Sequence, residues 1–305
     1  MIAAFSFLFG IVIGSFLNVC IHRLPRCSCG HALSKHQQEP KAGSESRCPE
    51  CECQDVRGQS IVWPGSHCPN CRHPIAAYDN IPLLSYLLLG GKCRYCKARI
   101  SPIYFFVELA TGLLFVLSYF LFGISLEFFR QATFGSLLIV LVMTDWQERI
   151  LPDWINFPGM AMGLLFALAV PVGDGTGLWL AHLAGMGSLP VAAVSLLDAL
   201  LGALAGGGLL FVLGELYFRL RHREGMGFGD VKMMAMVGCF LGPKLTLLTI
   251  LLGSFGGSVI GLLLMVAWRK GSDYELPFGT FLGFAAFFAS LWGWPILDWY
   301  RGFFP

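Results

Sequence analysis

Repeated long apolar runs constrain this chain more than any other feature. A helix needs about 20 consecutive apolar residues to cross about 30 Å of hydrocarbon. Segments that approach this length are Met1–Ile21, Ile103–Phe122, Phe129–Thr144, Trp154–Val172, Val194–Phe218, Val231–Leu241, Leu245–Trp268 and Gly279–Leu297. Only 13% of the residues are charged, which is about half the share typical of a water-soluble domain. The sequence therefore predicts an all-α polytopic membrane protein with about eight transmembrane helices, or seven if the short sixth segment is re-entrant.

Basic residues gather on one side of the expected helix bundle. The polar segment His22–Ser101 holds 11 of the 21 Lys and Arg residues. Strict alternation puts the turns near 145–153, 219–229 and 269–276 on the same side. Eighteen basic residues then lie on that side, counting Lys232 at its helix start, and the three on the other side are Arg130, Lys244 and Arg301. Because Lys and Arg concentrate on the cytoplasmic side of membrane proteins, we expect the long loop in the cytoplasm and both termini outside. The first basic side chains follow the first apolar run, so we expect an uncleaved helix there rather than a signal peptide.

Two C-x-x-C pairs stand in the long loop, Cys68 with Cys71 and Cys93 with Cys96. Four thiolates in this spacing suit one closed, tetrahedral zinc site with a structural role. Disulfides are disfavoured because the cytoplasm keeps thiols reduced. A redox C-x-x-C would need a thioredoxin-like strand and helix, which the sequence does not suggest. We therefore expect a structural Zn²⁺ on these four cysteines.

A second group of potential ligands precedes these pairs. Its members are Cys27, Cys29, Cys48, Cys51 and Cys53, with His31 and His36 close by. A second metal site and unliganded thiols in a polar insertion both fit this pattern, and the sequence leaves the choice open. We divide the chain into a first transmembrane helix (1–21), a cytoplasmic cysteine-rich zinc module (22–101, with an insertion at about 26–62) and a membrane-embedded bundle (102–305).

Two aspartates stand where apolar helices meet the cytoplasmic face. Asp145 closes the third apolar run, and Asp230 opens the sixth. A carboxylate at membrane depth is costly and by default indicates function. Two carboxylates that share a desolvated site keep one proton between them, so that one can act as a base toward water and the other as an acid toward a peptide carbonyl. The alternative for Asp230 is that it caps a helix N-terminus.

Other polar residues have weaker claims to a catalytic role. Asp153 follows a proline and precedes an apolar run, so we expect it to cap the fourth helix. Glu108 lies within the second apolar run without an evident partner. The run from Gly225 to Gly229 is no dinucleotide fingerprint, because no βαβ unit surrounds it. His182 falls on the side opposite the two aspartates.

A series of motifs in fixed order resembles the type IV prepilin peptidases, the bifunctional leader peptidase/N-methyltransferases of pilus and type II secretion systems. These motifs are Gly14-Ser-Phe-Leu-Asn18, His22-Arg23-Leu-Pro25, Cys68-Pro-x-Cys71, Tyr78-Asp79-Asn80-Ile-Pro82, Cys93-x-x-Cys96, Ser101-Pro102, Glu108-Leu-x-Thr-Gly112, Asp145, Leu-Pro-Asp153, Gly227-x-Gly229-Asp230-Val-Lys232 and Pro277-Phe278-Gly279. The resemblance covers nearly the whole chain. It departs at Cys27–Cys53, where most members of that family have few cysteines.

The resemblance implies a membrane aspartic endopeptidase of the bacterial inner membrane with Asp145 and Asp230 as its catalytic residues. It implies cleavage of a short basic leader from prepilins or pseudopilins at the cytoplasmic face. It also implies methylation of the new N-terminal residue with S-adenosylmethionine, and zinc on Cys68, Cys71, Cys93 and Cys96. Partners would be these substrates and the lipid bilayer, with no nucleic acid. The alternatives are a peptidase without methyl transfer, and a carboxylate-lined proton-coupled transporter. The sequence does not identify the client pilin, the S-adenosylmethionine pocket or the oligomeric state.

Overall fold

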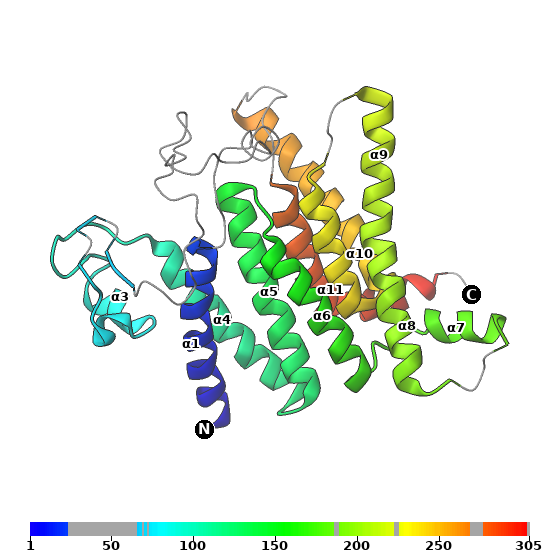
Figure 1. The fold of residues 1–305 in the computed structure, drawn as a ribbon, viewed down its shortest axis with the longest axis horizontal. Coiled ribbons are helices and arrows are strands. Elements are labelled where there is room, and N and C mark those ends of the chain that lie inside the picture. The colour runs from blue at the N-terminus through cyan, green and yellow to red at the C-terminus, as the bar shows by residue number, and fades with distance from the viewer. Residues whose placement is uncertain are drawn as a thin grey trace, which may run out of the picture.

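The computed structural model of the protein describes residues 1–23, 66–68, 70–71, 73–185, 189–222, 226–268 and 277–303. The helices run in the order α1 (Ile2–Arg23), η1 (Ala77–Asn80), α3 (Leu84–Leu88), α4 (Pro102–Phe122), α5 (Leu126–Glu148), α6 (Asp153–Ala169), α7 (Thr176–Leu183), α8 (Val191–Ala203), η2 (Leu204–Gly208), α9 (Leu209–Arg221), α10 (Phe228–Trp268) and α11 (Phe278–Arg301). The long helices form one bundle, and the small module around α3 lies beside α1 and α4 (Figure 1). The expected all-α architecture is confirmed.

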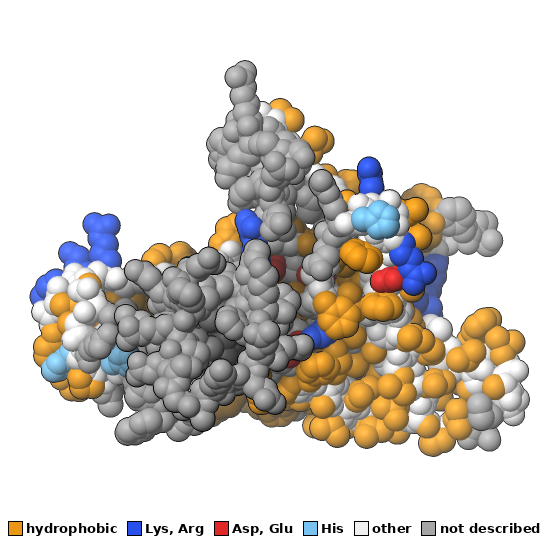
Figure 2. Space-filling view, turned by 45° about the horizontal axis from the view of Figure 1, so that its top comes forward, with side chains coloured by type: hydrophobic (Ala, Val, Ile, Leu, Met, Phe, Trp, Pro, Cys, Tyr) orange, Lys and Arg blue, Asp and Glu red, His pale blue; other side chains and the backbone are white. Residues whose placement is uncertain are grey.

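Within the described residues, six helical stretches are long and apolar enough to cross a membrane. They are α1, α4, α5, the continuous run Val191–Arg221, the stretch Phe228–Leu263 of α10, and α11, and the apolar helix α6 is shorter. The π-helical turn η2 joins α8 to α9 without interrupting the run. Figure 2 shows a broad apolar flank below a region that carries the blue basic side chains. This distribution suits a bundle with lipid around its sides and water at its end.

The difference from the expected eight segments lies in α10, which reverses direction. Gly242, with φ 76° and ψ 172°, interrupts the helical backbone and is followed by Pro243. Met234 and Thr246 both approach the same side of Gly206, although a straight helix would separate them by about 18 Å. The arms before and after Gly242 therefore lie against each other, and they correspond to the sixth and seventh expected segments.

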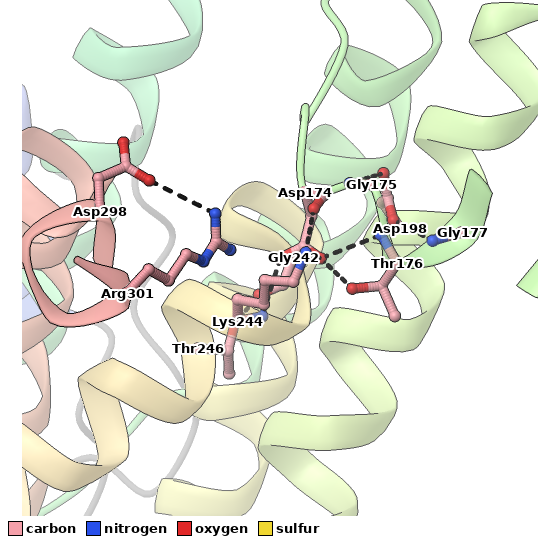
Figure 3. Close-up of polar contacts among 10 residues, drawn as sticks. All are labelled: Asp174, Gly175, Thr176, Gly177, Asp198, Gly242, Lys244, Thr246, Asp298 and Arg301. Carbon is pink, nitrogen blue, oxygen red and sulfur yellow. Dashed lines mark hydrogen bonds and ion pairs between the residues drawn. The ribbon is translucent and has the colours of Figure 1, made fainter. Parts of the chain in front are cut away.

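A polar cluster around Asp174, Asp198 and Lys244 holds this reversal next to Gly242 (Figure 3). The Asp174 side chain accepts a hydrogen bond from the backbone N–H of Lys244 at 2.9 Å. The Lys244 Nζ donates to the Asp174 carbonyl at 2.5 Å. Asp198 on α8 accepts the backbone N–H groups of Gly175 and Gly177 at 3.3 and 2.6 Å. Each buried carboxyl thus has donors, as buried polar groups require.

Small residues and methionines fill the space between α5, α6, α10 and α11. A Cβ on Gly159 would overlap Met236, and one on Gly283 would overlap Val142. Met233, Met236 and their neighbours on α10 are fully buried. Lipid tails are as apolar as these side chains, so close packing rather than hydrophobic burial holds such helices together. This packing fixes the ends of α5, α10 and α11 relative to one another.

Candidate active site and metal centre

The two aspartates come together although 85 positions separate them in the sequence. Asp145 stands in the last turn of α5 and Asp230 in the first turn of α10, and both side chains are buried. A Cβ placed on Gly279, the second residue of α11, would lie 3.0 Å from Asp230 Oδ1 and 3.1 Å from the Asp145 carboxyl carbon. The sum of these distances is the upper limit of the separation between the two groups. The glycine thus leaves room for both carboxyls at one point.

The two carboxyl groups have unequal surroundings. Asp145 Oδ2 accepts the backbone N–H of Thr280 at 2.5 Å and its hydroxyl at 2.8 Å. Asp230 Oδ1 is buried and has no hydrogen-bond partner among the described residues. The Asp230 backbone N–H donates to the Gly227 carbonyl at 3.1 Å, so Gly227 leads directly into the first turn of α10. Among the described residues, the Asp145 carboxyl therefore has two donors, whereas Oδ1 of Asp230 has none.

The four expected zinc ligands also converge. The sulfur atoms of Cys68, Cys71, Cys93 and Cys96 all lie within 4.8 Å of one another, and the Cys68 and Cys96 sulfurs are 3.7 Å apart. A tetrahedral ion with Zn–S bonds of about 2.3 Å requires sulfurs about 3.8 Å apart, so the arrangement fits zinc. No further described His, Cys, Asp or Glu completes this group. The second cysteine group, Cys27–Cys53, lies outside the described residues.

Backbone turns preorganise these thiols. The Cys68 N–H donates to the His73 carbonyl at 3.0 Å, and the Cys93 N–H donates to the Ala98 carbonyl at 2.9 Å. The backbone N–H of Ala98 and the side-chain amide of Asn70 lower the pKa of the Cys96 thiol to about 6. A thiolate is the form that binds metal, so this environment favours ligation by Cys96, whereas burial and the neighbouring thiols raise the pKa of Cys71 to about 11.

Comparison with known proteins decides the family. Residues 8–122 match the family described as "Bacterial Peptidase A24 N-terminal domain", and residues 132–262 match the "Type IV leader peptidase family". The chain is 36% identical to a prepilin leader peptidase/N-methyltransferase of Aeromonas salmonicida, over 96% of this chain and 92% of the relative. It is 35% identical to the protein of that name from Pseudomonas aeruginosa, over 94% and 89% of the two chains. The chain belongs to the prepilin leader peptidase/N-methyltransferase family. No solved structure was found to match it.

In this member of the prepilin leader peptidase/N-methyltransferase family, the two candidate sites lie in different matched regions. The N-terminal match contains all four converging cysteines, and the second match contains both aspartates. Gly279 and Thr280, which border the aspartates, lie beyond the second match. The contacts of Thr280 with Asp145 were not foreseen, because no local pattern signals a hydrogen bond between residues 135 positions apart.

Asp153 does not cap α6 in this family member, so that expectation is wrong. Pro152 occupies the cap position, and no side chain caps the helix. Asp153 instead pairs with Lys232 on α10, with Nζ 2.7 Å from Oδ1 and 2.8 Å from Oδ2. The Lys232 ammonium also lies over the rings of Phe157 and Phe228. This pair ties α6 to α10 two residues after Asp230.

Glu108 has a partner that the sequence did not reveal. Its Oε2 accepts the backbone N–H of Leu83 at 2.8 Å. Leu83 has φ 59°, a conformation uncommon for a residue other than glycine. Within the small module, Arg94 contacts Asp79 through two hydrogen bonds of 2.7 and 2.5 Å and lowers the pKa of that carboxyl. The Glu108 contact joins the cysteine module to α4 in the membrane bundle.

Proposed function

We propose that this chain cleaves the leader peptide from type IV prepilins or pseudopilins and then methylates the new N-terminal amine with S-adenosylmethionine. The observation that carries the peptidase part is the meeting of Asp145 and Asp230 at Gly279, in a chain of the prepilin leader peptidase/N-methyltransferase family. Both relatives named above carry these two activities in their names. The proposal makes Asp145 and Asp230 the catalytic pair.

Cleavage at such a pair follows from acid–base chemistry. Two close, buried carboxyls hold one proton between them, because ionising both would place like charges together. The ionised carboxylate removes a proton from water, whose oxygen attacks the peptide carbonyl. The protonated carboxyl gives its proton to the carbonyl oxygen. Both aspartates stand at helix ends, where an extended leader can approach from the membrane surface.

The orientation of the site follows from the basic residues. The side of the bundle expected to carry the aspartates holds 18 of the 21 Lys and Arg residues, counting Lys232 near the start of α10. This excess favours the cytoplasmic side of the membrane. The proposal therefore places cleavage at the cytoplasmic face of the bacterial inner membrane, where prepilin leaders are accessible before export.

The cysteine module would hold zinc in a structural role. Cys68, Cys71, Cys93 and Cys96 would supply four thiolates, which leaves no open coordination position for catalysis. Zinc bound in this way stabilises the fold of a small module. S-adenosylmethionine would supply the methyl group to the free amine that cleavage exposes, so methylation must follow cleavage.

One assay tests both activities. Protein purified in detergent is incubated with a prepilin and isotope-labelled S-adenosylmethionine, and the products are identified by mass spectrometry. We expect the mature pilin with a labelled methyl group on its N-terminus.

Asp145→Asn and Asp230→Asn should each abolish cleavage in folded protein, and their effects should not multiply in the double variant. Asp298→Asn, an exposed acid at the far end of α11, is the matched control. Near-normal turnover in either single variant would contradict the aspartic mechanism.

A further inference from the structure

The N-terminus of α11 points toward the Asp145 carboxyl group. Pro277 is the cap of this helix, and Thr280 is its third residue. The first N–H groups of a helix have no partner within it, and the helix N-terminus carries a partial positive charge. The Thr280 N–H meets this need by donating to Asp145 Oδ2 at 2.5 Å. Asp145 therefore caps α11 from another helix.

The Thr280 side chain adds a second hydrogen bond to the same oxygen. Its hydroxyl lies 2.8 Å from Asp145 Oδ2, and the residue is 2% exposed. Hydrogen bonds donated to a carboxylate favour its ionised form, and among buried groups, where the local dielectric is low, they are stronger than in solution. Because both donors hold Oδ2, the other oxygen of Asp145 is the one left to accept a proton.

Asp230 has the opposite environment. Its Oδ1 is buried without a partner among the described residues, and it faces the same point above Gly279 as the Asp145 carboxyl. A negative charge on this oxygen would have no donor among the described residues and would lie beside a second carboxylate. A proton on Asp230 removes both the free-energy cost of an unpaired buried charge and the repulsion between two carboxylates.

We propose that Thr280 is a positioning residue that keeps Asp145 ionised, so that Asp145 is the general base and Asp230 the general acid of cleavage. This inference rests on the function proposed above. Asp145 takes a proton from water, the water oxygen bonds to the carbonyl carbon, and the Asp230 proton moves to the carbonyl oxygen. The C–N bond then breaks, the amine leaves with the proton held by Asp145, and a hydroxyl of the intermediate returns a proton to Asp230.

Substitutions at position 280 separate this role from packing. Thr280→Val keeps the shape and the backbone N–H but removes the hydroxyl, and we expect kcat for cleavage to fall about 10- to 100-fold. KM should not change, because Thr280 acts on Asp145 rather than on the substrate. Thr280→Ser restores the hydroxyl and should return kcat to within a few-fold of the original. Thr249→Val is the matched control, because Thr249 is as deeply buried but donates only within its own helix, to the Leu245 carbonyl.

Infrared difference spectroscopy tests the assignment of the proton. The carbonyl band of a protonated carboxylic acid should disappear in Asp230→Asn and persist in Asp145→Asn. The reverse result would overturn the assignment of the proton to Asp230. This experiment does not use Thr280→Val, so it remains decisive if that variant fails to fold. Normal kcat in Thr280→Val, or equal losses in Thr280→Val and Thr249→Val, would overturn the role of Thr280. In those cases an inactive Asp145→Asn would leave the aspartic mechanism intact, whereas an active Asp145→Asn would refute the proposed function itself.

Discussion

Among single residues, Gly279 matters because it has no side chain. A Cβ at this position would lie 3.0 Å from Asp230 Oδ1 and 3.1 Å from the Asp145 carboxyl carbon. We expect Gly279→Ala to push the two carboxyls apart and to lower kcat for cleavage by about 100-fold, as small misplacements of reacting groups can. Gly257→Ala is a suitable control, since its nearest neighbour, Phe281, is at an ordinary contact distance of 3.4 Å. Unchanged kcat in Gly279→Ala would show that the pair does not need this space.

The pairing of Asp153 with Lys232 leads to a second prediction at this scale. Asp153→Asn and Lys232→Met should each lower thermal stability slightly, and a double-mutant cycle should give a coupling of about 0.2–1 kcal/mol, because the Asp153 side chain is half exposed. Cleavage should persist in Asp153→Asn, because its carboxyl is outside the pair at Gly279. A coupling of zero would mean that the two side chains do not interact in solution. Local preference pointed to a cap at Asp153, and only the fold shows that an ion pair 79 positions away replaces it.

Among the helices, the reversal of α10 depends on Gly242. Its backbone lies in a region that is almost restricted to glycine, where other residues cost about 1–3 kcal/mol. A Cβ there would also lie 2.9 Å from Asp174 Cβ and from Val172. We expect Gly242→Ala to lower the thermal midpoint clearly, measured as the protein that stays monodisperse after heating. Gly256→Ala lies on the same helix with no heavy atom within 4 Å of the added carbon, and it should be neutral or stabilising. Equal midpoints for both variants would refute the strain argument.

Helices were predictable from the sequence where their signal is local. Apolar length identified the long helices, and the break near Gly242 and Pro243 separated the two arms of α10. The eight-residue helix α7 and the π-helical turn η2 were not foreseen, because neither alters the apolar pattern. At the site, the sequence predicted that Asp145 and Asp230 lie at the same end of the bundle, and both carboxyls do lie beside Gly279. The donors on Thr280 and the partner of Glu108 could not be predicted, because both arise from contacts between distant segments.

In the whole molecule, the cysteine module and the aspartates lie in different parts of the chain, and the Glu108–Leu83 hydrogen bond and the Tyr86–Phe105 ring contact connect the module to α4. Replacing Cys68 and Cys71 by Ser should unfold the module, because structural zinc supplies much of the folding free energy of small modules. We expect methyl transfer to fall by orders of magnitude and cleavage to fall less, because α5 and α10 hold the aspartates. Equal loss of both activities in a folded, inserted variant would instead show that the module positions the prepilin for both reactions.

Metal analysis provides an independent measurement of the module. A variant in which Cys27, Cys29, Cys48, Cys51 and Cys53 are replaced by Ser should retain one zinc per chain, bound by the four cysteines that converge. A chain free of zinc would contradict the structural site. A second equivalent in the unaltered chain would assign a metal to the first cysteine group as well.

The position of Thr280 and Gly279 on the last helix has a consequence for biogenesis. Asp145 enters the membrane early in synthesis, but the residues that complete its surroundings follow 134 and 135 positions later, at the start of α11. If the two aspartates cleave as proposed, we expect the nascent chain to remain inactive until α11 inserts. A chain that ends at Trp268 should insert but not cleave, and co-expression of the missing C-terminal segment should restore cleavage. Full activity of the shortened chain would show that the dyad assembles without α11.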